Sequence, residues 1–163
     1  MATYKIRVAT GDFLCGGTMD SVAITLVGTQ GESPKFQLDS CGKDFSPGAV
    51  DEHVVQTERD LGPILLVRLH KERYSIFPQT RWNCSFVEVA GPGEEVYRFP
   101  CYQWIVGYTT LELREGAAKT ICKDAENQLL LRHRKEELRA KQQAYRYKEF
   151  QPGWPKCLDV DIR

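Results

Sequence analysis

The chain has 163 residues, 42% of them hydrophobic, and its 22 Lys and Arg residues balance its 22 Asp and Glu residues. This length and composition are typical of one globular domain with an appendage, and they exclude a disordered chain. The near-neutral charge leaves no basic stripe outside one predicted helix, which makes nucleic-acid binding the least favoured function. The sequence has no run of 18 apolar residues, and its N-terminus lacks the charged and then apolar pattern of a signal peptide. We therefore predict a cytoplasmic protein.

Short strands separated by turns are the dominant pattern up to about residue 115. Apolar residues alternate or run together in each predicted strand, and Gly and Pro mark the turns. The predicted strands cover residues 4–10, 22–27, 54–57, 64–69, 84–89, 96–99 and 110–113. Because no amphipathic helices lie between these strands, the sequence predicts a mainly β fold, an antiparallel β-sandwich.

A glycine-rich loop is predicted at residues 11–20, between the first two strands. Its three glycines give the backbone freedom to bring carbonyl oxygens together, and Asp12 and Asp20 add carboxylates at its ends. Phe13 and Leu14 place two apolar side chains at the loop tip. Oxygen ligands beside exposed apolar residues are typical of a hard cation and a lipid surface, whereas a tight hairpin with a half-buried tip is the alternative.

The pattern changes after Asp124 to that of one long helix. Residues 127–150 contain no Gly or Pro and are rich in Leu, Lys, Arg, Glu and Gln. Leu131, Leu138 and Tyr145 recur every seven residues, which predicts one narrow apolar stripe. We therefore predict two parts, a β-sandwich at 1–118 and a segment at 119–163 that holds a linker and the long helix.

The cysteines and histidines indicate no catalytic or metal centre. The six cysteines form no Cys-x-x-Cys pair, which argues against zinc and, in a reducing compartment, against disulfides; most are predicted to be small buried hydrophobic residues. His53, His70 and His133 stand 17 and 63 residues apart and form no helical pair of ligands. No Gly-x-Ser-x-Gly motif or phosphate-binding glycine loop occurs in the sequence either.

Several segments together resemble the amino-terminal PLAT (C2-like) domain of animal lipoxygenases. They are RVATG at 7–11, GTMD at 17–20, LVGTQGES at 26–33, DFSPGA at 44–49, LHKERY at 69–74 and FPCYQW at 99–104. The tail adds RKEEL at 134–138 and PGWP at 152–155, which are similar to the start of the lipoxygenase catalytic domain. Residues 70–74 and 119–124 most resemble the epidermis-type branch, which includes the hydroperoxide isomerase.

This resemblance implies an accessory domain without the parent's chemistry. Lipoxygenases act on polyunsaturated fatty acids by dioxygenation or hydroperoxide isomerisation, at a non-haem iron whose ligands lie several hundred residues beyond Arg163. The chain is therefore expected to be a fragment or a truncated form that is inactive by itself, with iron in the full-length parent only. The alternative is that this sequence is part of a longer, catalytically competent enzyme.

The family's calcium ligands can be carried onto three loops of this sequence. The resemblance implies ligands at Cys15, Gly17, Asp39, Ser40, Gly42, Asp44, Thr80 and Arg81. Asp39 and Asp44 supply carboxylates, whereas Cys15 contributes its carbonyl oxygen alone. Thr80 and Arg81 replace an acidic position of the family. Moderate to weak calcium binding is expected, and an ordinary acidic surface loop is the alternative.

Membrane contact is expected through exposed apolar side chains in loops. The candidates are Phe13, Leu14, Ile76, Phe77, Trp82 and Trp104, although Trp104 also suits the core. The predicted function is calcium-assisted peripheral attachment to a membrane surface. The alternative is docking to a protein partner, or self-association, through the sandwich or the helix at 127–150.

Overall fold

The computed structural model describes residues 1–38, 44–76, 78–117, 121–148, 151–153 and 157–160. The chain divides into two compact units, Met1–Ala118 and Lys119–Arg163. Asp39, Ser40, Gly42 and Phe77, which carry four of the predicted site positions, lie outside the described residues.

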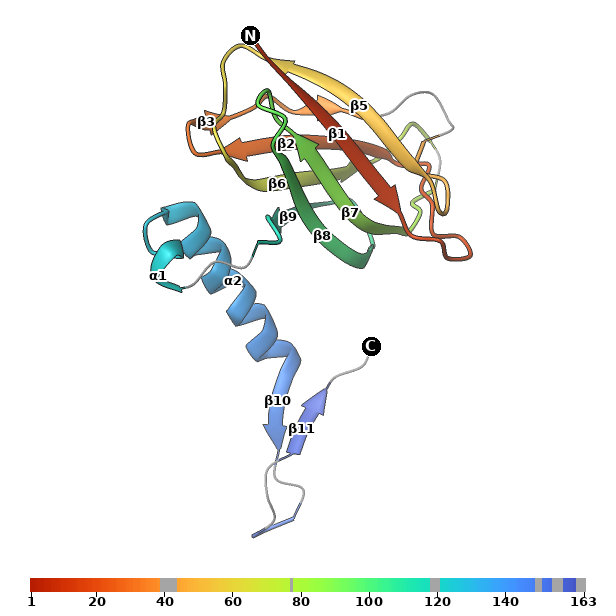
Figure 1. The fold of residues 1–163 in the computed structure, drawn as a ribbon. Coiled ribbons are helices and arrows are strands. Elements are labelled where there is room, and N and C mark those ends of the chain that lie inside the picture. Colours follow the sequence, from red (N-terminus) through yellow and green to blue (C-terminus); the bar gives the residue numbers. More distant parts are fainter. Residues whose placement is uncertain (39–43, 77, 118–120, 149–150, 154–156, 161–163) are drawn as a thin grey trace. The chain divides into compact units, whose positions relative to one another are not determined.

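The first unit is a sandwich of two antiparallel sheets (Figure 1). One sheet has the order β5-β1-β7-β8, and the other has the order β3-β2-β6-β9, with β4 paired to β2. The strands are β1 (Ala2–Thr10), β2 (Ser21–Gly28), β3 (Gly31–Glu32), β4 (Phe36–Gln37), β5 (Val50–Thr57), β6 (Ile64–Glu72), β7 (Trp82–Ala90), β8 (Val96–Ile105) and β9 (Thr109–Arg114). The predicted fold class is confirmed, and each predicted strand is present with longer bounds.

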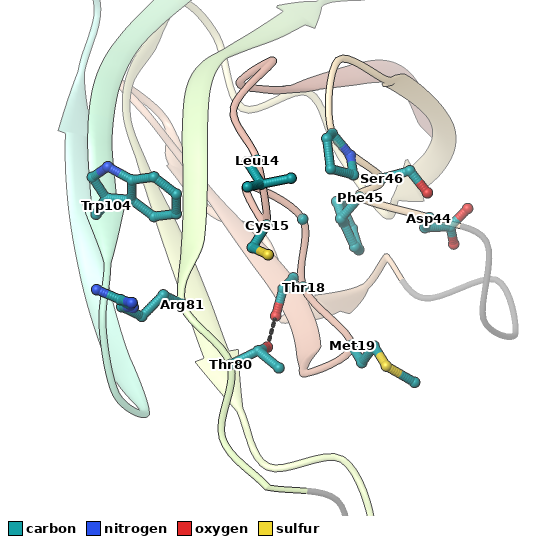
Figure 2. A pocket seen from close by; sticks show the side chains of 12 residues that line it. Leu14, Cys15, Thr18, Met19, Asp44, Phe45, Ser46, Thr80, Arg81 and Trp104 are labelled. Carbon is teal, nitrogen blue, oxygen red and sulfur yellow. Dashed lines mark hydrogen bonds between the residues drawn. The ribbon is translucent and has the colours of Figure 1, made fainter.

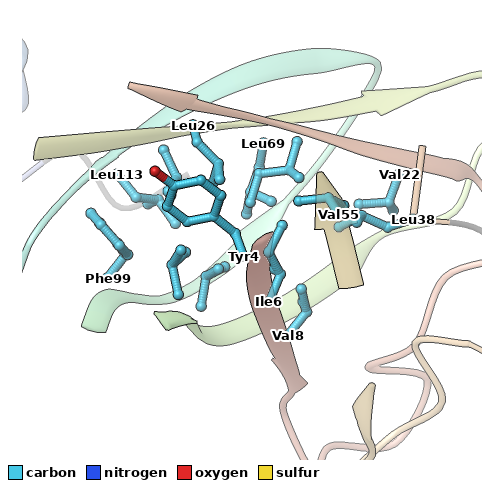
Figure 3. Close-up of a cluster of buried hydrophobic side chains, with 14 of the residues drawn as sticks. Tyr4, Ile6, Val8, Val22, Leu26, Leu38, Val55, Leu69, Phe99 and Leu113 are labelled. Carbon is cyan, nitrogen blue, oxygen red and sulfur yellow. The ribbon is translucent and has the colours of Figure 1, made fainter. Parts of the chain in front are cut away.

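Alternating apolar side chains from both sheets form the core. Tyr4, Ile6 and Val8 of β1 are buried at every second position and pack with Leu69 and Phe99 from other strands (Figure 3). Burial of such alternating faces is the main favourable term for a two-layer β fold. The core is therefore the part of the fold that the period-two pattern predicts most directly.

The second unit contains α1 (Ile121–Asp124), α2 (Gln128–Ala144), β10 (Tyr145–Lys148) and β11 (Cys157–Val160). The Asn127 side chain accepts a hydrogen bond from the backbone N–H of Leu129 at 2.9 Å, which caps the start of α2. The prediction of a helix to residue 150 is wrong, because α2 ends at Ala144. Tyr145 is extended, with φ −108° and ψ 110°, and pairs with Val160 of β11, so strand pairing replaces the last predicted helical turns.

Of the four cysteines whose burial the structure describes, one is fully buried, so the prediction that most are buried does not hold for these four. Cys84 is buried and Cys101 is half-buried, whereas Cys15 and Cys122 are exposed. The two exposed cysteines lie in a loop tip and in the short helix α1, outside the alternating core positions. Within the described residues, no helix combines the length and the apolarity that a membrane span requires.

Candidate functional site

Strand pairing gathers several loops at one end of the sandwich. Ser21 of β2 pairs with Glu72 of β6, and Thr10 of β1 pairs with Cys84 of β7. The loop that links β1 to β2 and the loop that links β6 to β7 therefore leave the same end. Val50 of β5 pairs with Ala9, and this brings the loop before β5 to that end too.

A cavity of about 690 Å³ opens among these loops. Arg81 and Trp104 lie on one side of it and Asp44 and Ser46 on the other, with Leu14 between them (Figure 2). The lining residues are Leu14, Cys15, Gly17, Thr18, Met19, Asp44, Phe45, Ser46, Pro47, Thr80, Arg81 and Trp104. The cavity therefore combines an apolar surface with one guanidinium and one carboxylate.

Backbone hydrogen bonds fix the glycine-rich loop beside the cavity. Gly11 donates its N–H to the carbonyl of Asn83 at 2.8 Å, and Asn83 donates its own N–H to the carbonyl of Gly16 at 2.8 Å. A Cβ atom at Gly17 would lie 2.5 Å from the carbonyl oxygen of Phe45, so this position requires glycine. The Gly16 carbonyl thus accepts a hydrogen bond from Asn83, while the Gly17 carbonyl accepts none from the described residues.

A buried cluster of opposite charges lies at the base of the loops. The Lys71 ammonium lies 2.6 Å from Oδ2 of Asp20 and donates to the carbonyl oxygens of Thr80 and Gly107 at 2.5 and 3.2 Å. The Thr80 N–H and hydroxyl each donate to the same carboxylate at 2.9 Å. Burial alone would raise the pKa of Asp20, but the hydrogen bonds from Lys71 and Thr80 outweigh it and hold that pKa below its usual value.

This cluster bears on two of the predicted calcium ligands, Thr80 and Arg81. Thr80 does not fit a calcium ligand, because its carbonyl, hydroxyl and N–H are committed to Lys71 and Asp20. The adjacent Arg81 lines the cavity with a positively charged side chain, which repels a cation. The carboxylate of Asp20, expected to add an anionic oxygen for a cation, is instead neutralised by the Lys71 ammonium.

The remaining predicted ligands form an incomplete set in the described structure. Cys15, Gly17 and Asp44 line the cavity together, which brings a carboxylate and two loop backbones to one place. Within the described ranges, no three His, Cys, Asp or Glu side chains are grouped in a way that suits a metal ion. Calcium takes six to eight oxygen ligands. Cys15, Gly17 and Asp44 therefore fit the edge of a calcium site rather than a whole one.

The predicted membrane residues fall into two groups. In the first group, Leu14, Ile76 and Phe13 are 94%, 86% and 56% exposed. Trp104 is 44% exposed, and the centroid of its ring system lies 6.0 Å from the centroid of the Phe13 ring. Trp104 lies within β8 rather than in a loop. The prediction for Trp82 is wrong, because Trp82 is fully buried and its Nε1 donates to the Thr10 hydroxyl at 3.1 Å.

Sequence reasoning missed Lys71 as the residue that organises this end of the sandwich. Lys71 follows Val67 and Leu69 at the period-two spacing of β6, and all three side chains are buried. A lysine at an inward position of a strand predicts a buried anionic partner, since an isolated charge in a core is costly. The alternation of buried positions in this strand could therefore have revealed that Lys71 is buried. It could not have identified the partner, Asp20, which lies 51 residues away in the sequence.

Comparison with known proteins agrees with this architecture. The PLAT/LH2 domain model matches residues 4–114. The chain is 52% identical over 161 residues to the hydroperoxide isomerase ALOXE3 of Homo sapiens, an alignment that covers 99% of this chain and 22% of that protein. The chain thus spans about a fifth of the length of the curated relatives it matches. The resemblance to lipoxygenases, and to the branch that includes the hydroperoxide isomerase, is confirmed.

Two solved lipoxygenases have the same fold over nearly the whole chain. A coral 8R-lipoxygenase, described with calcium activation via a C2-like domain, superposes with a TM-score of 0.77 at 25% identity, over 96% of this chain and 23% of that one. A calcium-dependent 11R-lipoxygenase superposes with a TM-score of 0.75 at 26% identity, over 98% of this chain and 24% of that one. Because the PLAT/LH2 domain model matches residues 4–114, which include nearly the whole sandwich, the chain belongs to the PLAT/LH2 domain family.

Proposed function

We propose that the sandwich is a calcium-assisted membrane-binding module of a lipoxygenase. The observation that carries this proposal is the exposure of Phe13, Leu14 and Ile76 in the loops at this end of the sandwich, where Leu14 and Asp44 line the same cavity. Large apolar side chains that project from loop tips are poorly hydrated and gain free energy when they enter a lipid surface. The calcium activation described for the coral relative supports the same role.

Calcium would act at the Asp44 side of the cavity, away from Arg81. The carbonyl of Gly17 and the carboxylate of Asp44 would be ligands, and Asp39, Ser40 and Gly42 remain predicted ligands outside the described residues. A bound divalent ion would neutralise carboxylates that otherwise repel anionic lipid. Because the set contains few carboxylates, the proposed affinity is moderate to weak.

The parent activity is part of the same proposal. A polypeptide of the relatives' length would carry the iron centre and convert polyunsaturated fatty acids by dioxygenation or hydroperoxide isomerisation. The module described in this chain would bring that activity from the cytoplasm to a membrane surface, where such substrates reside.

The experiment is vesicle sedimentation with the 163-residue chain, in calcium and in chelator. Replacing Phe13 and Leu14 together by Ala is expected to weaken vesicle binding by about tenfold or more, since full burial of one Leu or Phe contributes roughly 1.5–3 kcal/mol. Val54→Ala is the matched control, because Val54 is 64% exposed but lies in the middle of β5. Equal binding by the double variant and by Val54→Ala would remove these loops from the interface.

The calcium arm of the experiment uses Asp44. Asp44→Asn is expected to reduce the gain in vesicle binding that calcium gives, while binding in chelator is unchanged or stronger because a negative charge is removed. Glu58→Gln is the control, because Glu58 is exposed directly after β5, at the other end of that strand. A calcium response that is the same in both variants, or absent from the wild type, would contradict calcium assistance.

A second candidate function is docking through α2. Residues 135–145 are all exposed in the structure, and they include Leu138 at 53% and Tyr145 at 50%. An apolar side chain left in water on a helix face favours a packing partner, either another part of a longer protein or a protein partner.

A further inference from the structure

Arg81 has a fixed backbone position at the edge of the cavity. The preceding residue, Thr80, is tied to Asp20 through its N–H at 2.9 Å, and the following residue, Trp82, is fully buried in the core. Successive residues of an extended chain point to opposite sides, so a buried Trp82 directs Arg81 away from the core. The exposed Arg81 side chain lines the cavity with Leu14 and Trp104 (Figure 2).

No carboxylate compensates the Arg81 guanidinium in the described structure. Arg81 has no ion pair and no side-chain hydrogen bond among the described residues. The carboxylate that its neighbour Thr80 contacts, that of Asp20, is paired with the Lys71 ammonium at 2.6 Å. Because the Lys71–Asp20 pair is neutral by itself, the Arg81 guanidinium is left as an uncompensated positive charge on this side of the cavity. Such a surface attracts an anion.

The neighbours of Arg81 indicate which kind of anion this surface would meet. Leu14 is 94% exposed and Trp104 is 44% exposed, and both line the cavity beside Arg81. An indole ring settles at the headgroup level of a bilayer, while an apolar loop tip reaches the acyl boundary. If Leu14 and Trp104 contacted a bilayer, Arg81, which lines the same cavity, would lie near the lipid headgroups.

We propose that Arg81 binds the phosphate of an anionic glycerophospholipid headgroup at this cavity. The guanidinium donates two parallel N–H bonds to two phosphate oxygens, which is the geometry that favours Arg at phosphate sites. The inference deepens the proposed membrane function and rests on it. It assigns the two sides of the cavity different roles, with calcium beside Asp44 and lipid phosphate beside Arg81, so part of the membrane affinity is independent of calcium.

The test measures binding to vesicles of phosphatidylcholine with and without 30% phosphatidylserine, in chelator, at about 0.1 M salt. Arg81→Gln is expected to lower affinity for the anionic vesicles by about fivefold or more, the contribution of one basic residue near such a surface. Arg81→Lys is expected to restore part of this loss, since it keeps the charge but not the paired donors. Arg59→Gln is the matched control, with the same change of charge.

Arg59 suits this control because it lies at the other end of the sandwich. It follows β5, whose last residue Thr57 pairs with Ala2 at the start of β1, whereas the cavity lies beyond Thr10. Eight residue steps of strand span roughly 25 Å, which exceeds the screening length of about 10 Å at 0.1 M salt. Its removal is therefore expected to leave vesicle binding nearly unchanged.

Three outcomes would overturn the inference. If Arg81→Gln binds anionic vesicles as Arg59→Gln does, while the wild type still binds them, Arg81 is not a phosphate ligand and the membrane function stands. If the wild type binds no vesicles in chelator but binds them in calcium, the inference fails and the proposed function stands; if it binds none in either condition, both fail. If millimolar inorganic phosphate at constant ionic strength abolishes vesicle binding, the site prefers free phosphate to the lipid.

Discussion

Lys71 and Asp20 form an ion pair inside the sandwich, with the ammonium nitrogen 2.6 Å from the carboxylate and both side chains at most 2% exposed. Burying two charges costs several kcal/mol each, and a pair of this kind offsets the cost when further hydrogen bonds satisfy the remaining donors and acceptors. Thr80 and Gly107 provide those bonds. The pair therefore links the segments around Asp20, Thr80 and Gly107 at this end of the sandwich.

The first prediction concerns removal of one partner. Lys71→Met leaves the Asp20 carboxylate buried and unpaired, which is expected to lower the free energy of unfolding by about 3–5 kcal/mol. Guanidinium unfolding followed by the fluorescence of the buried Trp82 measures the change. Lys5→Met is the control, because the Lys5 pair with Glu52 is half-exposed and contributes at most about 1 kcal/mol. The double variant Lys71→Met with Asp20→Asn is expected to recover part of the loss; equal effects at Lys71 and Lys5 would contradict the prediction.

The second prediction concerns pH. Because the pKa of Asp20 is lowered in the folded state, its carboxylate stabilises the fold fully above its unfolded pKa of about 3.9, and that contribution is lost as the pH falls through the folded pKa. The difference in unfolding free energy between wild type and Asp20→Asn is therefore expected to be constant above about pH 5 and to shrink below about pH 4. Denaturant titrations between pH 2 and pH 6 give this difference. A difference that does not change with pH would show that Asp20 titrates alike in both states.

Residues with a local pattern were predictable from the sequence, and residues fixed by distant partners were not. Tyr4, Ile6 and Val8 alternate within one strand, so their burial follows from the sequence itself. Trp82 begins a strand after a polar loop, and the side it faces is set by pairing with Ile105. Tyr145 fits a seven-residue helical repeat but pairs with Val160, because contacts between distant residues override a weak local preference.

The third prediction concerns the two cysteines on β7 and β8. The hydrogen bond from the Cys84 thiol lowers the pKa of Cys101, against its partial burial, and bonds from Gln103 lower it further. The same hydrogen bond, together with burial, raises the pKa of Cys84. Since the thiolate is the reactive form, Cys101 is expected to be alkylated by iodoacetamide in the native protein well before Cys84. Mass spectrometry of labelled peptides resolves the two sites.

The control for this prediction is Cys84→Ala. It removes the thiol donor to Cys101, so the labelling of Cys101 is expected to slow at neutral pH while the exposed Cys15 reacts at its usual rate. Labelling of Cys84 and Cys101 at equal rates in the folded wild type would contradict the assigned hydrogen bond.

The last prediction concerns α2. Leu130 is 3% exposed, and Arg134 donates to the buried Asp124 at 2.6 Å, so the first half of the helix has a buried apolar side chain and an ion pair. Residues 135–144 are exposed, and an isolated helical segment gains little stability from propensity alone. In a monomer, the amides of residues 135–144 are therefore expected to exchange with solvent faster than those of residues 130–134, by hydrogen exchange with mass spectrometry.

Two variants distinguish packing from exposure in this helix. Leu138→Glu is expected to leave the exchange of residues 130–134 unchanged, whereas Leu130→Glu is expected to accelerate exchange along the whole helix, because it places a charge at a buried site. Were the chain dimeric through the α2 stripe, Leu138→Glu would dissociate the dimer, which sedimentation velocity detects. Strong protection of residues 135–144 in a monomer would contradict the prediction, because it requires a packing partner for Leu138 within the same chain.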